Sequence, residues 1–197
     1  MKKDSRNIDI LCIGEVLIDF IGHQSGALID KTKDYHRYLG GSPTNVAMNS
    51  ARLGMSSVMI ASVGEDGFGD YIFENLGAVG VNTKYIRKIK DMPTRVIFVS
   101  RTTATPDFIP YREADSQIIE DQISKDLLSR TNIFHTTCFA LSKQPAQTTI
   151  LKKAKEAFKL GCKLSIDVNF AKKLWSSQEE ALEVIKTRSH LRIADNI

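Results

Sequence analysis

A glycine pair followed by an asparagine marks the stretch of this sequence whose residue types best suit a small ligand. Gly40 and Gly41 lead directly into a predicted helix, and Asn45 follows within its first turn. Glycines let a backbone approach a ligand without interference from Cβ atoms, and a helix N-terminus offers free N–H groups. An amide can both donate to and accept from hydroxyl groups. The combination suits a polyhydroxylated ligand, although it would also serve a tight turn before a capped helix.

Sequence motifs for several other chemistries are absent. No G-x-x-x-x-G-K-[ST] stretch occurs, which argues against a P-loop enzyme. No G-x-G-x-x-G follows the first predicted strand, which weakens the case for a dinucleotide-dependent oxidoreductase. His135 and Cys138 have i, i+3 spacing, but on a predicted strand they would face opposite sides of the sheet. We therefore expect a core histidine and a core cysteine there, and no metal site.

The overall composition is that of an ordinary globular protein. The chain has 197 residues, 42% hydrophobic and 25% charged, and a net charge of +4 from scattered lysines and arginines. Scattered charges do not favour nucleic-acid binding. The three cysteines lie far apart, no signal-peptide pattern is visible, and no apolar stretch approaches the roughly 18 residues of a membrane span. These features predict a cytoplasmic protein that binds neither nucleic acid nor membrane.

Short apolar runs alternate with amphipathic segments along most of the chain. Strands are predicted at 8–14, 57–64, 131–137 and 163–169, and helices at about 43–53, 67–79, 121–129, 144–160 and 177–188. Ser42 is the expected N-cap of the first helix, with Pro43 at N1, and Asp66 caps the second. Strand–helix alternation implies parallel pairing, so the sequence predicts an α/β fold with a doubly wound sheet flanked by helices.

Two stretches break this alternation. Residues 94–101 and 107–112 are rich in β-formers and joined by a polar turn, which predicts a hairpin with Pro110 in an edge strand. With the stretch near 15–38, they are expected to form a small β-sheet lid inserted into a single domain, at about 15–38 and 94–112. The last segment, 191–197, begins like a buried strand and stops, so we expect the C-terminal part of the fold to be missing.

The segment from residue 40 to residue 64 resembles the N-terminal signature of the PfkB/ribokinase family of carbohydrate kinases. Its constrained positions are in register with that signature: Gly40, Gly41, Asn45, Ala47, Gly54 and Gly64. "LCIGEVLIDFIG" is similar to the family's first strand with its downstream aspartate. "FIPYREAD" resembles the lid return strand of fructokinase-like members, and "SIDVNFAKKLW" resembles an element of fructokinases and ketodeoxygluconate kinases. The resemblance implies a ribokinase-like, mostly parallel sheet with a β-sheet lid, of which this chain is the N-terminal two-thirds or so.

The resemblance also implies roles for individual residues. Asp19 would accept hydrogen bonds from sugar hydroxyls, and Gly40, Gly41 and Asn45 would contact the same sugar. Arg112 would bind a sugar hydroxyl or carboxylate, because a guanidinium can hold either by two parallel bonds. Other roles remain open, since Asp19 could be a lid carboxylate that faces solvent, and Arg112 could form a surface ion pair.

Two further polar residues, Asp167 and Asn169, lie where a strand ends, at the edge where doubly wound sheets bind ligands. We expect them near the site but not in catalysis. The arginine that often follows in this family element is replaced by Ala171, with Lys172 and Lys173 next to it. For a phosphate contact from this element, Lys172 or Lys173 would have to supply the positive charge.

The family's magnesium-associated segment, its glycine-rich anion hole with the catalytic aspartate and its adenine pocket have no counterpart in the sequence up to Ile197. The complete enzyme would use ATP and Mg²⁺, and its catalytic base would lie downstream of Ile197. Because such a base takes the hydroxyl proton while an anion hole stabilises the transferred group, we expect no phosphoryl transfer from this chain alone.

The favoured interpretation is the sugar-binding part of an ATP-dependent, fructokinase-like sugar kinase. Fructose is the first candidate substrate, and 2-keto-3-deoxygluconate is the second because Arg112 could pair with its carboxylate. A non-catalytic sugar-binding or sensor protein of kinase fold is the alternative, and a nucleotide-binding oxidoreductase is a third. The lid would also support a homodimer by covering exposed β edges.

Overall fold

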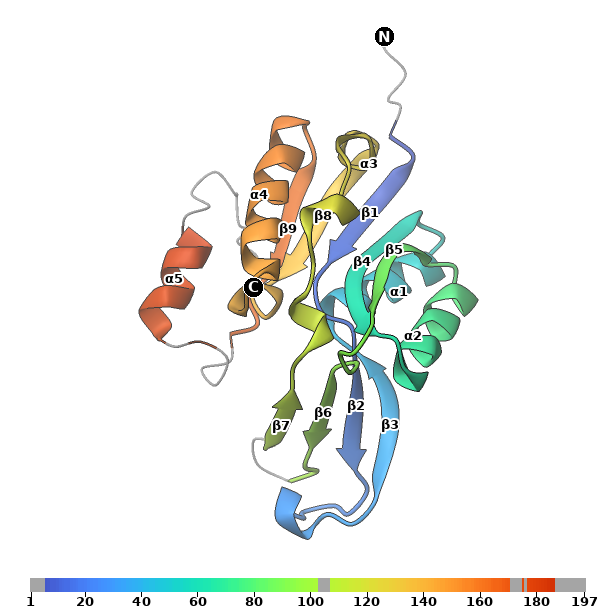
Figure 1. Ribbon diagram of the computed structural model, residues 1–197, viewed down its shortest axis with the longest axis vertical. Coiled ribbons are helices and arrows are strands. Elements are labelled where there is room, and N and C mark those ends of the chain that lie inside the picture. Colours follow the sequence, from blue (N-terminus) through green and yellow to red (C-terminus); the bar gives the residue numbers. More distant parts are fainter. Residues whose placement is uncertain (1–5, 103–106, 171–174, 176, 187–197) are drawn as a thin grey trace.

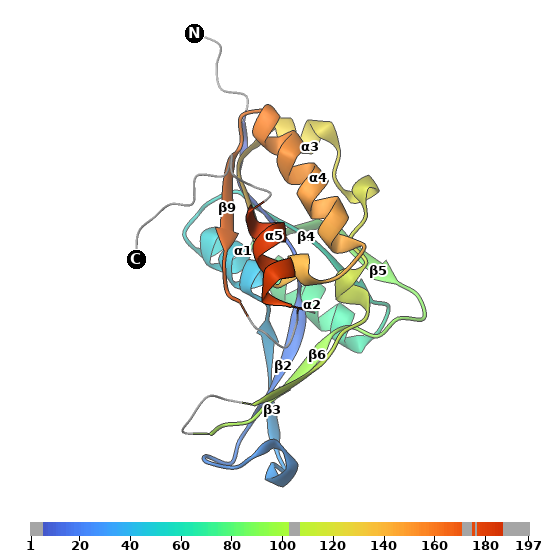
Figure 2. The same ribbon diagram turned by 90° about the vertical axis from the view of Figure 1, so that its left-hand side faces the viewer.

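Two β-sheets meet end to end in the computed structural model of the chain (Figure 1). A five-stranded sheet carries helices on both faces, and a four-stranded sheet extends beyond one end of it (Figures 1 and 2). The structure describes residues 6–102, 107–170, 175 and 177–186. The predicted strand at 191–197 and residues 171–173 therefore lie outside the described residues.

The core sheet has the strand order β5-β4-β1-β8-β9, and every neighbouring pair is parallel. Its strands are β1 (Ile8–Ile13), β4 (Ser57–Gly64), β5 (Asn82–Ile89), β8 (Thr131–Thr137) and β9 (Lys163–Asp167). The chain runs outward from β1 to β5 and then continues on the other side of β1 with β8, so the order reverses between β1 and β8. This confirms the predicted doubly wound sheet, with β5 as a strand that the sequence pattern did not predict.

The helices cover the core sheet from both sides. On one face lie α1 (Ser42–Arg52) and α2 (Gly67–Ala78), and on the other α3 (Lys125–Ser129) and α4 (Ala146–Lys159) (Figure 1). The last described helix, α5 (Gln178–Lys186), packs through Ala181 against the α4 side. No described helix is long and apolar enough to cross a bilayer.

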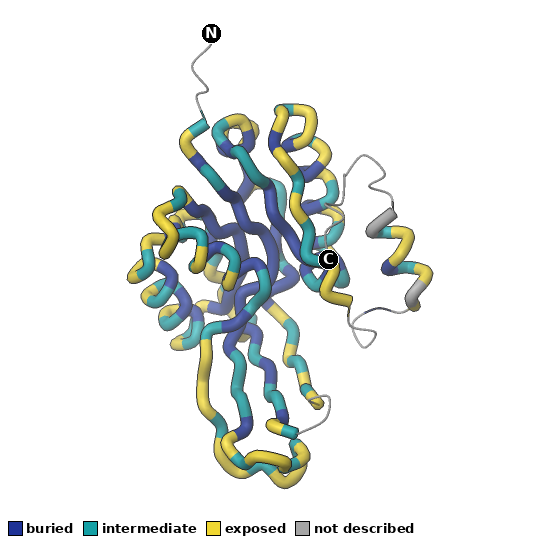
Figure 3. Tube along the Cα trace, turned by 180° about the vertical axis from the view of Figure 1, so that it is seen from behind, coloured by how far each residue is buried: buried dark blue, intermediate teal, exposed yellow. Residues whose placement is uncertain are grey.

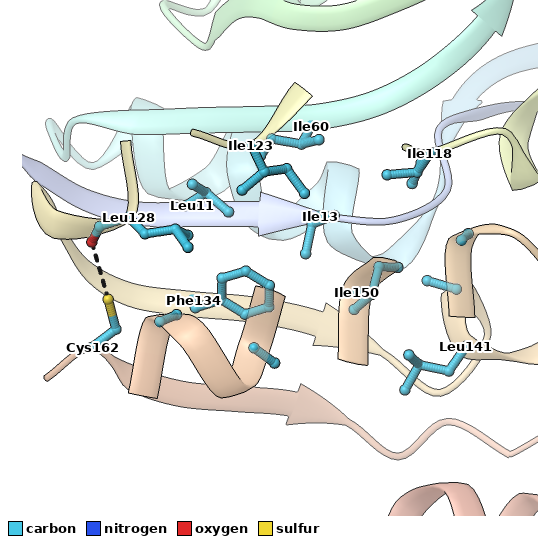
Figure 4. Packing of buried hydrophobic residues seen from close by; sticks show 14 of the residues in the cluster. Leu11, Ile13, Ile60, Ile118, Ile123, Leu128, Phe134, Leu141, Ile150 and Cys162 are labelled. Atoms are coloured by element: carbon cyan, nitrogen blue, oxygen red, sulfur yellow. Dashed lines mark hydrogen bonds between the residues drawn. The ribbon is translucent and has the colours of Figure 1, made fainter. Parts of the chain in front are cut away.

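Each face of the core sheet buries its own apolar cluster. Leu11, Ile13 and Phe134 pack with Ile150 of α4 on one side, where the Cys162 thiol also donates to the carbonyl of Leu128 at 3.2 Å (Figure 4). Cys12 and Met59 pack with residues of α1 and α2 on the other side, and Ile18 of the neighbouring sheet joins this second cluster. The second sheet is therefore anchored to the α1 and α2 side of the core.

Two predicted helix boundaries were wrong. The N-cap of α1 is Gly41, not Ser42, because Gly41 adopts a φ of 108° and its carbonyl accepts the first helical bond, from Asn45 N, at 2.9 Å. The single helix predicted at 121–129 is divided into a 3₁₀ turn, η3 (Glu120–Gln122), and the short α3. Ser124 causes the division, since its hydroxyl accepts from Leu127 N at 3.1 Å and so begins a new helix.

The second sheet, which we call the lid sheet, has the order β3-β2-β6-β7. Its strands are β2 (Leu17–Gly22), β3 (Tyr35–Gly40), β6 (Val96–Val99) and β7 (Phe108–Tyr111). The predicted hairpin is confirmed as the antiparallel β6–β7 pair, and Pro110 lies in the edge strand. Three further 3₁₀ turns, η1 (Ile29–Lys31), η2 (Ala114–Ser116) and η4 (Ala140–Ser142), complete the described elements.

The two faces of the lid sheet differ in chemistry. Residues directly opposite one another share a face, so Tyr38, Asp19, Ile97 and Pro110 form one row across the four strands. The other face carries aromatic side chains, with the rings of Phe20 and Phe98 stacked at 5.1 Å. Phe20 also meets Phe68 of α2 at 5.7 Å, which fixes the lid sheet to the core.

Candidate functional site

The carboxylate of Asp19 lies directly over the glycine pair. β2 and β3 are antiparallel, and a Cβ atom at position 40 would overlap an oxygen of Asp19. Gly41 is also constrained, because its φ is 108° and a Cβ atom there would stand 2.5 Å from the carbonyl oxygen of Glu15. Both glycines are thus required by close approach, and they bring Asp19 to the beginning of α1.

Asn45 lies one turn into α1 and is exposed to solvent. Because Gly41 is the N-cap, Asn45 is the fourth residue of the helix, one place later than the sequence pattern suggested. Its side-chain amide remains near the N-terminus of α1, the end toward which Asp19 is held. The structure therefore gathers Asp19, Gly40, Gly41 and the first turn of α1 in one region at the root of the lid.

A buried carboxyl, Glu15, joins this region to the core sheet. It follows β1 directly and its side chain accepts from the Thr137 hydroxyl at 2.9 Å and from Ser42 N at 3.3 Å. Only 3% of Glu15 is exposed, and burial raises its pKa to about 7. Glu15 thereby connects the carboxyl end of β8 with the N-terminus of α1, at the point where the strand order reverses.

Asp167 and Asn169 reach the same edge of the sheet from β9. The Ser42 hydroxyl donates to the Asp167 carboxylate at 2.5 Å, which links β9 to the first residue of α1. Asn169 is exposed, and its backbone N–H donates to Asp167 at 3.1 Å. Asp167 therefore helps to hold the first residue of α1 in place, and this agrees with the expected position near the site.

Arg112 forms an ion pair with Asp115. An ion pair at the surface was one of the two roles considered for Arg112, but this pair is largely buried. Its Nε donates to Asp115 at 3.0 Å, its Nη1 donates to the Ser142 hydroxyl at 2.7 Å, and its side chain is only 11% exposed. The Asp115 side chain is fully buried. Arg112 is therefore held in one orientation instead of moving freely at the surface.

A second guanidinium, that of Arg95, lies behind this pair. Arg95 immediately precedes β6, two residues before Ile97, so strand alternation places it on the lid face that carries Asp19. Its Nη1 donates to Asp115 at 2.9 Å. Burial raises the pKa of Asp19, and the positive charge of Arg95 acts in the opposite direction. Asp19, Arg95 and Arg112 thus share one electrostatic environment on this face.

A different groove, of about 580 Å³, lies on the other face of the lid root. It is lined by Arg37 and Val96 of the lid and by Asp66 and Phe68 at the start of α2. The Asp66 carboxylate already accepts from the N–H groups of Phe68, Gly69 and Thr94 and from the Thr94 hydroxyl. Because its acid is saturated by protein donors, this groove offers less for a hydroxyl-rich ligand than the region around Asp19.

Comparison with known proteins identifies the chain. The protein-family model described as "pfkB family carbohydrate kinase" matches residues 7–193. The chain belongs to the pfkB family of carbohydrate kinases. It is 32% identical over 184 residues to the ATP-dependent 6-phosphofructokinase of Thermoanaerobacterium thermosaccharolyticum, covering 93% of this chain and 56% of that protein. The chain spans about half the length of the curated relatives that it matches.

Solved structures of pfkB-family relatives have the same fold. Fructokinase from Halothermothrix orenii matches with a TM-score of 0.86 at 33% identity, covering 91% of this chain and 64% of that one. The sugar kinase PH1459 from Pyrococcus horikoshii, in complex with ATP, matches with a TM-score of 0.84 at 32% identity, covering 90% and 59%. The ribokinase-like architecture expected from the sequence is therefore confirmed.

A metal site is not formed by the described part of the chain. There, no three His, Cys, Asp or Glu side chains come together as a metal site requires. His135, for example, is buried and its Nδ1 lies 2.9 Å from the Ser165 hydroxyl. The described residues alone therefore form no site that fits a Mg²⁺ ion.

Two residues of the site, Glu15 and Arg95, were not found from the sequence. Glu15 stands between two apolar runs, and its position directly after the first strand was the available signal. Arg95 stands in a β-rich run, and its partner Asp115 is 20 residues away. No local pattern connects Arg95 with Asp115, since only the pairing of β6 with β7 brings them together.

Proposed function

We propose that this chain carries the sugar-binding part of an ATP-dependent carbohydrate kinase of the fructokinase type. The observation that carries the proposal is the Asp19 carboxylate held over Gly40, beside the N-terminus of α1. In this proposal Asp19 accepts from sugar hydroxyls, and Gly41 and Asn45 contact the same sugar. Arg112, which directly follows β7, provides a guanidinium for the same sugar.

Fructose is the first candidate, supported by the match to the Halothermothrix orenii fructokinase. Fructose 6-phosphate is included because one relative is named a 6-phosphofructokinase. 2-keto-3-deoxygluconate is the other candidate, since Arg112 is 11% exposed and, beyond its bonds to Asp115 and Ser142, keeps further guanidinium N–H groups that can donate to a carboxylate. Isothermal titration calorimetry of the chain with each of the three compounds ranks them.

The test of the site is Asp19→Asn. Loss of a charged acceptor should weaken sugar binding about 10- to 100-fold, the range for a hydrogen bond to a charged group. The unfolding midpoint should not fall, because burial already disfavours the ionised carboxyl. Asp30→Asn, which changes an exposed lid carboxylate in η1, is the matched control and should leave affinity unchanged. Equal affinities for Asp19→Asn and the natural chain would exclude Asp19 as a ligand.

ATP would supply the phosphoryl group when bound, and the groups that hold it are proposed to lie beyond residue 197. A coupled assay of this chain with ATP and fructose is accordingly expected to show no turnover. A longer form that transfers phosphate to the bound sugar would support the kinase. Sugar binding without transfer in every form would instead favour the alternative, a sugar sensor of kinase fold.

The proposal extends to assembly and location. Tyr111 and Ile109 of the edge strand β7 are exposed, and a second lid covering them would protect a free sheet edge, so we propose a homodimer through the lid. Cys12, Cys138 and Cys162 are buried and lie outside any disulfide, which suits the reducing cytoplasm.

A further inference from the structure

Arg95 and Arg112 share a single carboxylate oxygen. Oδ2 of Asp115 accepts from Arg95 Nη1 at 2.9 Å and from Arg112 Nε at 3.0 Å. The same ring, that of Phe139, lies under both guanidinium groups, at 4.1 Å for Arg95 and 5.0 Å for Arg112. The two arginines are therefore parts of one cluster, built from the root of β6, the end of β7, η2 and the residue before η4.

The inner member of the cluster is an unfavourable residue to bury. No part of the Arg95 side chain is exposed, and its Nε and Nη2 have no hydrogen-bond partner among the described residues. An apolar side chain of similar size often stabilises a fold more than a buried ion pair does. Arg112 alone would still neutralise Asp115. Packing and charge balance therefore give little reason for an arginine at position 95.

The positions of its neighbours give a better reason. Arg112 Nε and Nη1 are both engaged, by Asp115 and Ser142, so the orientation of Arg112 depends on the orientation of the Asp115 carboxylate. Arg95 fixes that carboxylate from behind. Arg95 also bears the charge that acts on Asp19, the carboxylate over Gly40.

We propose that Arg95 is a positioning residue for the sugar site, which orients Arg112 through the shared Asp115 carboxylate and supplies the positive charge behind Asp19. This inference rests on the proposed function, because it assigns Arg95 to the same site. Arg95 acts through Asp115 and Asp19, and its complete burial keeps it from the ligand.

The charged groups around the cluster determine which change of pKa a pH test should detect. The charged groups that face Arg95 are Asp115 in η2, Arg112 just after β7 and Glu15 after the end of β1. Asp19 of β2 faces it from across the lid sheet. In the natural chain Arg95 favours the ionised form of Asp19. Removing this charge should therefore raise the pKa of Asp19, so that less of the carboxylate is available to accept from a sugar in mildly acidic solution.

The variants are Arg95→Met, which keeps the length and removes the charge, and Arg95→Lys, which keeps the charge and loses the planar fork. Carboxyl ¹³C NMR follows the Asp19 titration without any ligand, and calorimetry measures affinity for the sugar that the natural chain binds. We expect Arg95→Met to raise the midpoint of the Asp19 titration and to weaken binding about tenfold at pH 6. The loss should be smaller at pH 8. Arg95→Lys should restore the midpoint.

The matched control is Arg37→Met, which removes an arginine from the other face of the lid sheet, where it stacks on Tyr71 at 3.9 Å. It should leave the Asp19 titration unchanged.

If Arg95→Met changes only the melting temperature and leaves the Asp19 titration and the pH profile as they were, Arg95 is structural and the proposal is wrong. If Arg95→Met does not fold, an Asp19 midpoint in Arg95→Lys equal to that of the natural chain supports the role of charge, and a raised one contradicts it. A natural chain that binds none of the three sugars contradicts the proposed function, while the NMR titration still decides the role of Arg95.

Discussion

The core sheet and the lid sheet are buried to very different extents (Figure 3). All eight residues of β4 are buried, and helices cover both faces of the strand. In the lid, β3 has one buried residue, Gly40, and β7 has none. The centre of the core sheet therefore depends on apolar packing along the whole strand, whereas the lid is stabilised by its root and by aromatic contacts on one face.

This difference separates two roles within one chain. In the core the polar groups of the candidate site lie where strands end, as with Glu15 and Asp167. The lid is partly exposed and can carry polar groups within a strand, as Asp19 shows. The candidate site lies where these two sheets meet, and there a charged side chain is both held in place and near solvent.

The largest expected effect on the free energy of unfolding tests the difference in packing between the core sheet and the lid sheet. Phe134→Ala removes a ring that is 1% exposed and packed in the centre of the α4-side cluster (Figure 4). It should lower the free energy of unfolding by about 3–5 kcal/mol, as expected for a buried aromatic residue. Phe98→Ala, in the partly exposed lid, is the control and should lose about 1–2 kcal/mol. Urea unfolding of both variants checks this, and equal losses would mean that the lid is as tightly packed as the core.

The same contrast decides what could be predicted from sequence. Residues 57–64 and 131–137 are both rich in apolar or β-branched side chains, and both strands were predicted with the bounds that the structure shows. β5 was missed because it is an edge strand in which exposed and partly buried residues alternate, with lysines at 84 and 88. Periodicity detects a strand buried on both faces more readily than one with charged residues at the sheet edge.

The site follows the same rule. Gly40 and Gly41 were predictable as a glycine pair before a helix. Gly41 has a φ of 108°, which favours glycine, whereas Gly40 is required by the close approach of Asp19. Arg95 was not predictable, since its role depends on Asp115 and on the pairing of β6 with β7. Residues that act through their own backbone leave a local signal, and residues that act through long-range partners do not.

A smaller effect concerns Glu15, the carboxyl between β1 of the core and β2 of the lid. Its pKa is raised from 4.5 to about 7, so between these pH values the folded state binds more protons than the unfolded state. The contribution of Glu15 to stability therefore falls as pH rises through this window, by at most roughly 3 kcal/mol. Glu15→Gln should remove this trend, so its stability relative to the natural chain should increase from pH 4.5 to pH 8.

The difference between variant and natural chain is the quantity to measure, because His135, whose pKa burial lowers, contributes a trend of the opposite sign below pH 6.5. Glu120→Gln serves as control. Glu120 is paired with Lys152 at the surface, which lowers its pKa, so this variant should lose relative stability as pH rises. A Glu15→Gln difference that does not vary with pH would show that Glu15 is not held in the protonated form by burial.

The smallest expected effect on stability concerns the exposed edge of the lid. Tyr111 is 57% exposed in β7, and its ring meets Phe98 at 6.0 Å. Tyr111→Ser should change the free energy of unfolding of the monomer by no more than about 0.5 kcal/mol, as for most surface substitutions. If the proposed dimer forms through this edge, the same change should weaken it, because Tyr111 would be buried against the second lid. Light scattering over a range of concentrations separates the two results, with Leu53→Ser, at an 83% exposed position after α1, as the control that should leave assembly unchanged. A natural chain that stays monomeric at high concentration would exclude a dimer through the lid.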